Sequence, residues 1–192
     1  MEEYALLLSF EDTIHTYKGK DVIVFDMAPT ALTLRFFSLP FITLIWLNEL
    51  LKLRKEIYQK KEIISKIKIG KKEFERDRVK SKLEILIHTY QTLRDLFLSD
   101  VAKITLVMND DRLSFSEAVR IRQKLNDIGI HFHRVVINKA QSEEIPEEIR
   151  IEFMHQKITM FPYSSKRLLG LQTIAEYIDT NKEIFTLTEM LS

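Results

Sequence analysis

Residues 103–138 contain two apolar runs with one helical segment between them, and this order constrains the fold more than any other feature. The runs 103–109 and 132–138 are short and nearly continuous in apolar residues, as in strands buried on both faces. Between them, Ser114 and Glu117 have capping-box spacing and predict the start of a helix, which Gly129 ends. A strand, helix and strand in this order predict a βαβ unit and an α/β fold with a mostly parallel sheet.

Two more apolar segments extend this α/β core. We expect a strand at residues 22–26, buried on both faces because its apolar run is continuous, and a last strand at residues 158–161. Helical spacing of apolar residues predicts a helix over residues 2–18 and another from about residue 165 to 178. The tail, residues 182–191, could add one short helix.

Residues 31–99 show no strand signal, and a connection of this length is far longer than a crossover needs. We therefore expect residues 1–30 and 100–192 to form an α/β core of the nucleotide-binding type. Residues 31–99 would form a helical insertion subdomain, divided by Gly70.

Composition bounds the class of protein. A chain of 192 residues with 45% hydrophobic and 30% charged residues suits one globular domain, or one domain that carries a large insertion. A formal net charge of +1 gives no electrostatic case for specific nucleic-acid binding. The absence of cysteine excludes disulfides and thiolate metal sites.

The N-terminus has no signal-peptide pattern, because Glu2 and Glu3 stand where a basic region would be. The longest apolar stretch, residues 36–47, is interrupted by Ser38, Pro40 and Thr43 and is shorter than the roughly 20 residues of a membrane span. We expect a cytoplasmic protein.

Charge is concentrated in residues 52–82, where thirteen Lys or Arg and five acidic residues leave a net of +8. Mixed charge on helices is usually a solvated face. The alternative is an anionic partner, such as a membrane surface, an acidic protein or nucleic acid.

Two polar residues follow expected strands and are candidates for ligand binding. Asp26 ends the 22–26 run, and a carboxylate at such a place can hold Mg²⁺ through waters, although Asp also caps turns before proline. Asn138 ends the 132–138 run, where its amide can donate and accept against a base edge. Asparagine is also a common turn residue at the end of a strand.

Residues 21–40 resemble the signature of the arsenite-pump (ArsA-type) ATPase family, which includes the targeting ATPase for tail-anchored membrane proteins. That family carries D-T-A-P-T-G-H-T, then L-R and S-L-P; this chain reads Asp26-Met27-Ala28-Pro29-Thr30-Ala31-Leu32-Thr33, then Leu34-Arg35 and Ser38-Leu39-Pro40. The later segments Val135–Asn138, Phe161-Pro162 and Leu169–Leu171 are similar in the same order. Met27, Ala31 and Leu32 depart from the pattern, and Ala31 weakens the switch because glycine allows closer backbone approach to a ligand.

The resemblance implies a Rossmann-like P-loop NTPase sheet of the SIMIBI class that binds ATP or ADP with Mg²⁺. It implies that Asp26 is the Walker B carboxylate for Mg²⁺ and that Pro29 and Thr30 begin the phosphate-sensing switch. It assigns the adenine base to Asn138 and to a loop with Pro162 and Tyr163.

No glycine-rich phosphate loop is found in the 192 residues, so we interpret the chain as truncated, without the Walker A segment and the first strands of the sheet. Without those donors we expect it to hydrolyse ATP poorly or not at all by itself, although the resembled family hydrolyses ATP. The strands at 22–26 and 104–108 would lose a neighbour. They would pair with each other, with a second copy in a homodimer, or with a complementing chain that carries the P-loop; we favour another chain.

Two functional hypotheses remain open. The first is an ATPase-family protein in which adenine nucleotide is coupled to a helical client- or partner-binding subdomain. The second is a non-enzymatic, degenerate relative that binds a protein, such as a hydrophobic helical client or a membrane protein. The second would use the apolar cluster Phe36, Phe37, Phe41, Ile42, Ile45 and Trp46 as a groove, although core packing explains that cluster equally well.

Overall fold

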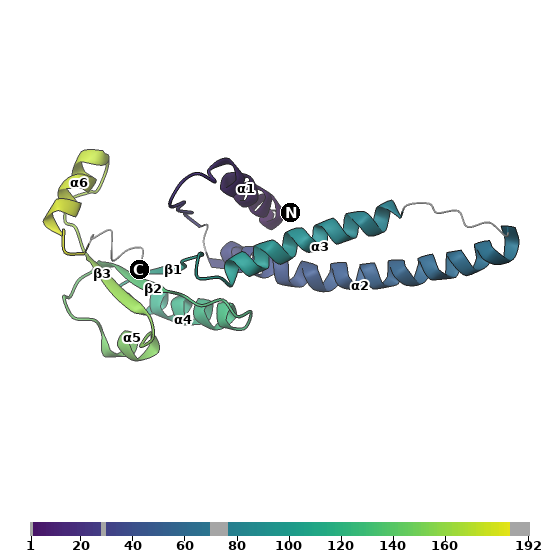
Figure 1. Ribbon diagram of the computed structural model, residues 1–192. Helices are drawn as coiled ribbons and strands as arrows, with labels where there is room; N and C mark the ends of the chain where they lie inside the picture. The colour runs from purple at the N-terminus through teal and green to yellow at the C-terminus, as the bar shows by residue number, and fades with distance from the viewer. Residues whose placement is uncertain (1, 28–29, 70–76, 185–192) are drawn as a thin grey trace. The chain divides into compact units, whose positions relative to one another are not determined.

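The computed structural model describes residues 2–27, 30–69 and 77–184 and divides the chain into two compact units, residues 1–99 and 100–192 (Figure 1). We call them the helical unit and the α/β unit. The residues before 31 group with the helical unit in this division. The boundaries expected from the sequence, which join residues 1–30 to 100–192, stay a prediction about the complete fold.

The helical unit contains α1 (Glu2–Thr16), α2 (Thr30–Ile69) and α3 (Arg78–Phe97). The expected helix at 2–18 is confirmed except for its last residues. Helices α2 and α3 make up most of residues 31–99, as expected, and they pack side by side with α2 continuing past the first residue of α3 (Figure 1). Gly70 lies outside the described residues.

Five phenylalanine rings pack together in the helical unit. Phe10 of α1 lies 4.4 Å from Phe25, 5.3 Å from Phe36 and 5.6 Å from Phe97, measured between ring centroids. Phe37 completes the cluster at 5.2 Å from Phe36 and 5.1 Å from Phe97. Tilted and edge-to-face pairs at these distances are favourable, so the cluster fastens the start of α2 to the end of α3 and to α1.

An ion pair between Arg54 and Asp77 joins α2 to the start of α3, at the opposite end of α3 from the phenylalanine cluster. Asp77 caps α3 by accepting a hydrogen bond from the Lys80 amide at 3.0 Å, and it also accepts three hydrogen bonds from the Arg54 guanidinium of α2. The Arg54 guanidinium, and then the Lys80 amide, hold the pKa of Asp77 below its ordinary value. The charged form of Asp77 therefore holds the first turn of α3 against α2.

The prediction of a strand at residues 22–26 is wrong, because residues 20–27 form no helix or strand. Val24 is 87% exposed, so the run is not buried on both faces. Phe25 packs on Phe10 instead. A short apolar run becomes a strand only when a neighbour pairs its backbone groups, and the strands of the described chain all belong to the α/β unit.

Residues Ala31–Ile64 of α2 form a helix that is long and apolar enough to cross a membrane. The sequence analysis considered only the apolar stretch 36–47, which is too short for a span, and the continuous helix is longer than that stretch. A core helix of a soluble protein passes the same test. Pro40 lies inside α2 and is fully buried.

The α/β unit follows the predicted order of strands and helices, with one short helix, α5, that the sequence analysis did not predict. Its elements are β1 (Thr105–Asn109), α4 (Arg112–Asn126), β2 (Arg134–Ala140), α5 (Glu147–Glu152), β3 (Lys157–Pro162) and α6 (Leu171–Thr180). The three strands are parallel in the order β1-β2-β3, with Asn109 opposite Asn138 and Asn138 opposite Phe161. The α/β fold and the βαβ unit are confirmed.

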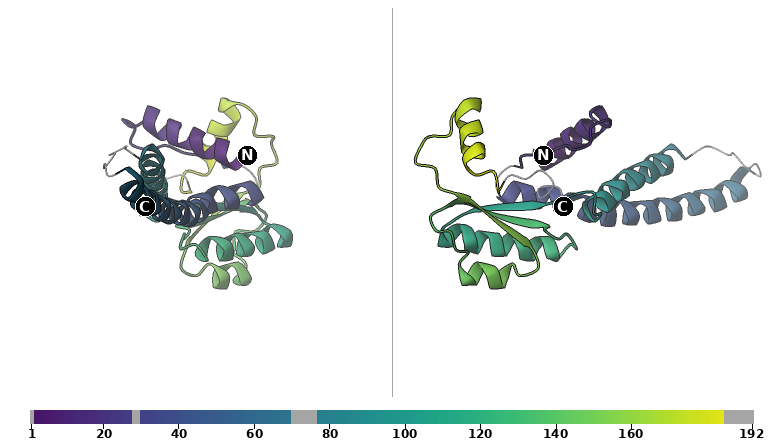
Figure 2. Two further views of the ribbon diagram at one scale, coloured as in Figure 1. Left: turned by 90° about the vertical axis from the view of Figure 1, so that its right-hand side faces the viewer. Right: turned by 60° about the vertical axis from the view of Figure 1, so that its left-hand side comes forward.

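Helices α4 and α5 cover one face of this sheet (Figure 2). Val135, Ile137 and Phe153 are fully buried. Strand β1 alternates buried and exposed residues and forms the edge of the sheet, with no neighbour on its outer side in the described chain. Completion of this edge by another chain therefore stays a prediction.

Helix α4 begins three residues earlier than Ser114 predicted. Asp111 is its N-cap and accepts hydrogen bonds from the Ser114 amide at 2.8 Å and the Ser114 hydroxyl at 2.7 Å. Asp and Ser are both good caps, and here the earlier residue adopts the extended backbone that capping needs. Gly129 follows the helix with a φ of 80°, as expected of a glycine stop.

Candidate nucleotide-base site

A cavity of about 410 Å³ opens where β2 and β3 end in the α/β unit. Its lining includes Asn138, Pro162 and Tyr163, the three residues that the sequence assigned to the adenine base. The carboxyl ends of parallel strands are the usual place for ligands in α/β sheets. The cavity also lies within the range of about 300–1,000 Å³ for small-molecule sites.

The backbone beside Asn138 is irregular. Lys139 has a φ of 57°, the left-handed region that residues other than glycine rarely adopt, and the pairing of β2 with β3 shifts register between Asn138 and Ala140. The Tyr163 amide then donates to the Ala140 carbonyl at 2.9 Å. Bulges and backbone strain of this kind often occur next to binding sites, where they redirect a side chain.

Helix α6 forms the opposite wall. The Tyr177 hydroxyl donates a 2.7 Å hydrogen bond to the Pro162 carbonyl and so fastens α6 to the end of β3. Ile174 and Ile178, one helical turn apart, line the cavity beside it. Burial raises the pKa of Tyr177, so its hydroxyl stays protonated at neutral pH and available as the donor.

This wall and the strand ends offer two kinds of contact. Pro162, Tyr163 and Ile174 present apolar surface suited to a flat ring. The side-chain amide of Asn138 forms no hydrogen bond in the described part of the chain, so both its donor and its acceptor face can serve a ligand. The arrangement suits a planar heterocycle with a mixed donor and acceptor edge.

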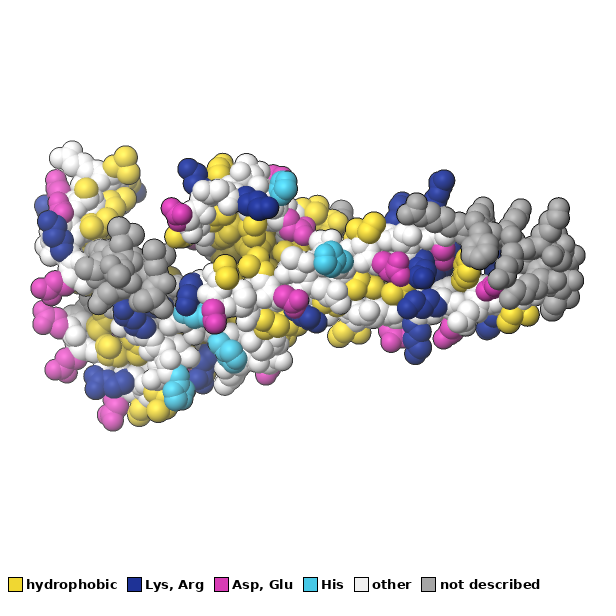
Figure 3. All heavy atoms as spheres, viewed as in Figure 1, with side chains coloured by type: hydrophobic (Ala, Val, Ile, Leu, Met, Phe, Trp, Pro, Cys, Tyr) yellow, Lys and Arg dark blue, Asp and Glu magenta, His cyan; other side chains and the backbone are white. Residues whose placement is uncertain are grey.

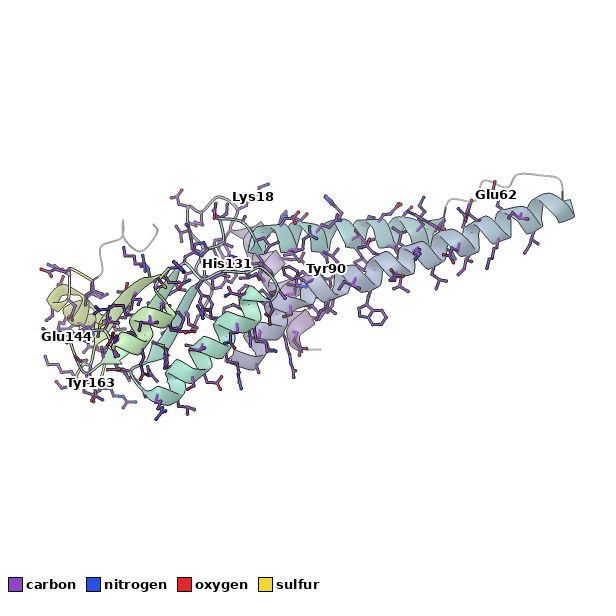
Figure 4. The ribbon with its side chains drawn as sticks, turned by 90° about the horizontal axis from the view of Figure 1, so that it is seen from below. Lys18, Glu62, Tyr90, His131, Glu144 and Tyr163 are labelled. Carbon is purple, nitrogen blue, oxygen red and sulfur yellow. The ribbon has the colours of Figure 1, made fainter. Side chains whose placement is uncertain are left out.

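The sequence analysis did not assign several lining residues to the site, among them Lys139, Lys166, Ile174, Tyr177 and Ile178. The helix expected from about residue 165 begins only at Leu171, after Gly170 with a φ of 85°. The sequence did indicate that α6 could line a cavity, because Ile174, Tyr177 and Ile178 are spaced as on one face of a helix. Figure 4 labels Tyr163 at the strand end that carries the site.

The remaining predicted nucleotide residues are placed differently. Asp26 is exposed in the irregular segment of the helical unit, so its expected position at the end of a strand is wrong. Its role as a Mg²⁺ ligand stays a prediction. Pro29 lies outside the described residues, and Thr30 is the first residue of α2, with its side chain outside the described set.

The predicted partner-binding cluster is divided by the structure. Phe36 and Phe37 are buried in the aromatic core, and Phe41 is half-buried. Ile42, Ile45 and Trp46 are 53%, 66% and 67% exposed. The six residues therefore do not form one groove, because helical geometry turns them to different sides of α2.

The parallel sheet and the cavity at its strand ends define an α/β protein of the Rossmann-like class. A family model described as "Anion-transporting ATPase" matches residues 1–161, so the chain belongs to the anion-transporting, ArsA-type ATPase family.

Relatives agree with this assignment. The chain is 30% identical over 124 residues to "ATPase GET3C" of Arabidopsis thaliana, an alignment that covers 63% of this chain and 32% of that protein. It is 32% identical over 124 residues to "ATPase ASNA1 homolog 2" of Paramecium tetraurelia, covering 62% of this chain and 38% of the relative. The chain thus spans about a third of the length of the curated relatives that it matches.

Proposed function

We propose that the α/β unit binds the base of an adenine nucleotide, ATP or ADP, as part of an ATPase of this family. The observation that carries the proposal is the cavity that brings Asn138, Pro162 and Tyr163 together at the strand ends. Family membership supports it, since the relatives named above are called ATPases.

The geometry suggests a role for each residue. The Asn138 amide would donate to and accept from the Watson–Crick or Hoogsteen edge of adenine, the pairing that asparagine makes with that base elsewhere. Tyr163 and Pro162 would pack on the ring, with Tyr177 holding the Pro162 carbonyl. Lys139 and Lys166, which also line the cavity, would attract the anionic part of the nucleotide. Mg²⁺ would stabilise phosphate charge when bound, with Asp26 as its proposed carboxylate.

Titration with a fluorescent ADP analogue tests the base site. We expect Asn138→Ala to weaken binding of the adenine nucleotide and to reduce its preference over the guanine analogue, because the edge contact is lost. Asn109→Ala is the matched control: Asn109 ends the neighbouring strand opposite Asn138 but does not line the cavity. Equal losses for both variants, or none for Asn138→Ala, would contradict the proposal.

A second candidate function is partner binding by the helical unit without hydrolysis. It is supported by the exposure of Ile42, Ile45 and Trp46, side chains that a solvated helix seldom presents together. Titration of an apolar helical peptide should shift the emission of Trp46, the only tryptophan in the chain. An unchanged emission at saturating peptide would end this candidate.

A further inference from the structure

We propose that Asp110 is a positioning residue of the base site, which holds residues 138–141 in the irregular conformation that lets Asn138 and Lys139 line the same cavity. The inference rests on the proposed function, because it concerns how that site distinguishes one base from another. Asp110 directly follows Asn109, the last residue of β1, and is not among the described residues that line the cavity. It therefore acts on a ligand through the residues that it holds.

Two consecutive residues of β2, Asn138 and Lys139, line the cavity together. Successive side chains of a regular strand point to opposite faces of the sheet. The strand is not regular here, because Lys139 has a φ of 57° and the pairing with β3 shifts register between Asn138 and Ala140. This irregular step is what allows an amide and an ammonium group to serve one site.

Hydrogen bonds hold the irregular step from both sides. On the side of β1, the Asp110 amide donates to the Asn138 carbonyl at 3.3 Å, and the Asp110 carboxylate accepts from the Gln141 amide at 3.0 Å. On the side of β3, the Tyr163 amide donates to the Ala140 carbonyl at 2.9 Å. A residue other than glycine keeps a left-handed conformation only where its surroundings determine that conformation.

The Asp110 carboxylate makes the one bond of these three that a substitution can remove. The other two bonds join backbone groups and do not depend on side-chain identity. Without the carboxylate, the amide of the exposed Gln141 bonds to water, and the chain after Asn138 can return to ordinary strand geometry. Lys139 then turns away from the face of the sheet that Asn138 occupies.

The two positioned groups recognise different parts of a nucleotide. The Asn138 amide binds the base edge, and the Lys139 ammonium attracts the anionic part. Basic and acidic side chains are interspersed over the face of the α/β unit that Figure 3 shows, so on that face the attraction of an anion depends on individually placed cations. Asp110 thus determines whether base and anion are recognised together.

Competition of ADP and GDP against a fluorescent ADP analogue measures the preference for adenine. We expect Asp110→Ala to reduce that preference about fivefold, the size of effect that one lost hydrogen bond produces. Asp110→Asn should retain it, because the asparagine side-chain oxygen can still accept from the Gln141 amide. The same change in both variants would mean that only the charge of Asp110 matters, and the proposal would be overturned.

Asp111→Ala is the matched control for general destabilisation. It removes the neighbouring carboxylate, which caps α4 and accepts hydrogen bonds from Ser114. This variant should lower the stability of the α/β unit and leave the preference for adenine unchanged. An equal loss of preference in Asp111→Ala and Asp110→Ala would show that destabilisation, and not positioning, is the cause.

Lys139→Gly tests the mechanism by relieving the backbone. Glycine adopts a positive φ without steric cost, so the irregular step then depends less on the Asp110 carboxylate. We expect Asp110→Ala to reduce the preference for adenine less in the Lys139→Gly background than in the unmodified chain. Equal reductions in the two backgrounds would contradict a role of Asp110 through the conformation of Lys139.

NMR of the ligand-free chain separates this inference from the proposed function. The backbone ¹³C shifts of Lys139 report its φ, and they should move to strand values in Asp110→Ala but not in Asp110→Asn. Unchanged shifts in Asp110→Ala, or a loss of adenine preference in Asn138→Ala alone, would overturn this inference and leave the base site standing. If the shifts move as expected but the unmodified chain does not bind the ADP analogue, the proposed function fails, and the role of Asp110 in base selection fails with it.

Discussion

The two units differ in what happens to their predicted binding residues. In the α/β unit, Asn138, Pro162 and Tyr163 come from two strands and the loop that follows, and they meet in one cavity. In the helical unit, six predicted residues that are close neighbours in sequence are divided between a buried core and an exposed surface. Parallel strands bring their carboxyl ends together whatever their separation in sequence, whereas a helix turns successive residues to different sides.

The largest expected effect tests whether the two units are stabilised separately. Phe36→Ala should destabilise the helical unit by about 3–5 kcal/mol, because it opens a cavity in the aromatic cluster. Phe153→Ala is the matched change in the α/β unit, where Phe153 is fully buried. Hydrogen exchange resolved by peptide should show loss of protection within residues 1–99 for the first variant and within 100–192 for the second. Loss across the whole chain in both variants would mean that the units unfold as one.

A smaller effect is expected from the Asp77 cap. Asp77→Ala removes the N-cap of α3 and leaves Arg54 without its carboxylate, so thermal unfolding followed by circular dichroism should begin at a lower temperature. Asp95→Ala in the same helix is the control, because the Asp95 side chain is 63% exposed whereas that of Asp77 is 8% exposed. Equal melting temperatures for the two variants would mean that the cap does not hold the helices together.

The α/β unit should show a pH dependence that comes from His133. The His133 Nδ1 accepts a hydrogen bond from the Ile104 amide at 3.2 Å, and burial, followed by the nearby Lys103, lowers the pKa of His133. Neutral His133 therefore favours the folded state. Its contribution is complete above the unfolded pKa of about 6.5 and is lost as pH falls through the lower folded pKa.

Denaturant unfolding at several pH values checks this contribution. His133→Gln should flatten the decline in stability below pH about 6.5, whereas His155→Gln, an exposed histidine of the same unit, should not. An unchanged decline in the His133 variant would assign the dependence to other groups.

The smallest expected effect concerns Asp26. We expect calorimetry to show weak binding of Mg-ATP by the 192-residue chain and turnover near background, because its sequence contains no glycine-rich phosphate loop. Asp26→Asn should then change little. Micromolar affinity with turnover that Asp26→Asn abolishes would contradict this and indicate a phosphate site of another kind.

Much of the α/β unit could be predicted from the sequence. Apolar runs of strand length around one glycine-terminated helix determine a parallel βαβ unit, and this order places Asn138 beside the end of β3. The cavity's other wall was not predicted, because α6 begins at Leu171 and depends on the turn at Gly170. The capping of α4 by Asp111 rather than Ser114 likewise depended on which of two suitable caps adopts extended backbone.

The sequence by itself determined which segments of the α/β unit are strands, its family and the residues that end the strands, because these depend on local patterns. Only the tertiary structure decided that residues 22–26 are not a strand, since a strand requires a partner for its backbone groups. It also decided which side of α2 is buried. The apolar residues of α2 lie on more than one side of the helix, and the Arg54–Asp77 pair and the phenylalanine cluster place α3 against one side. Trp46, Ile42 and Ile45 lie on another side of α2 and stay exposed.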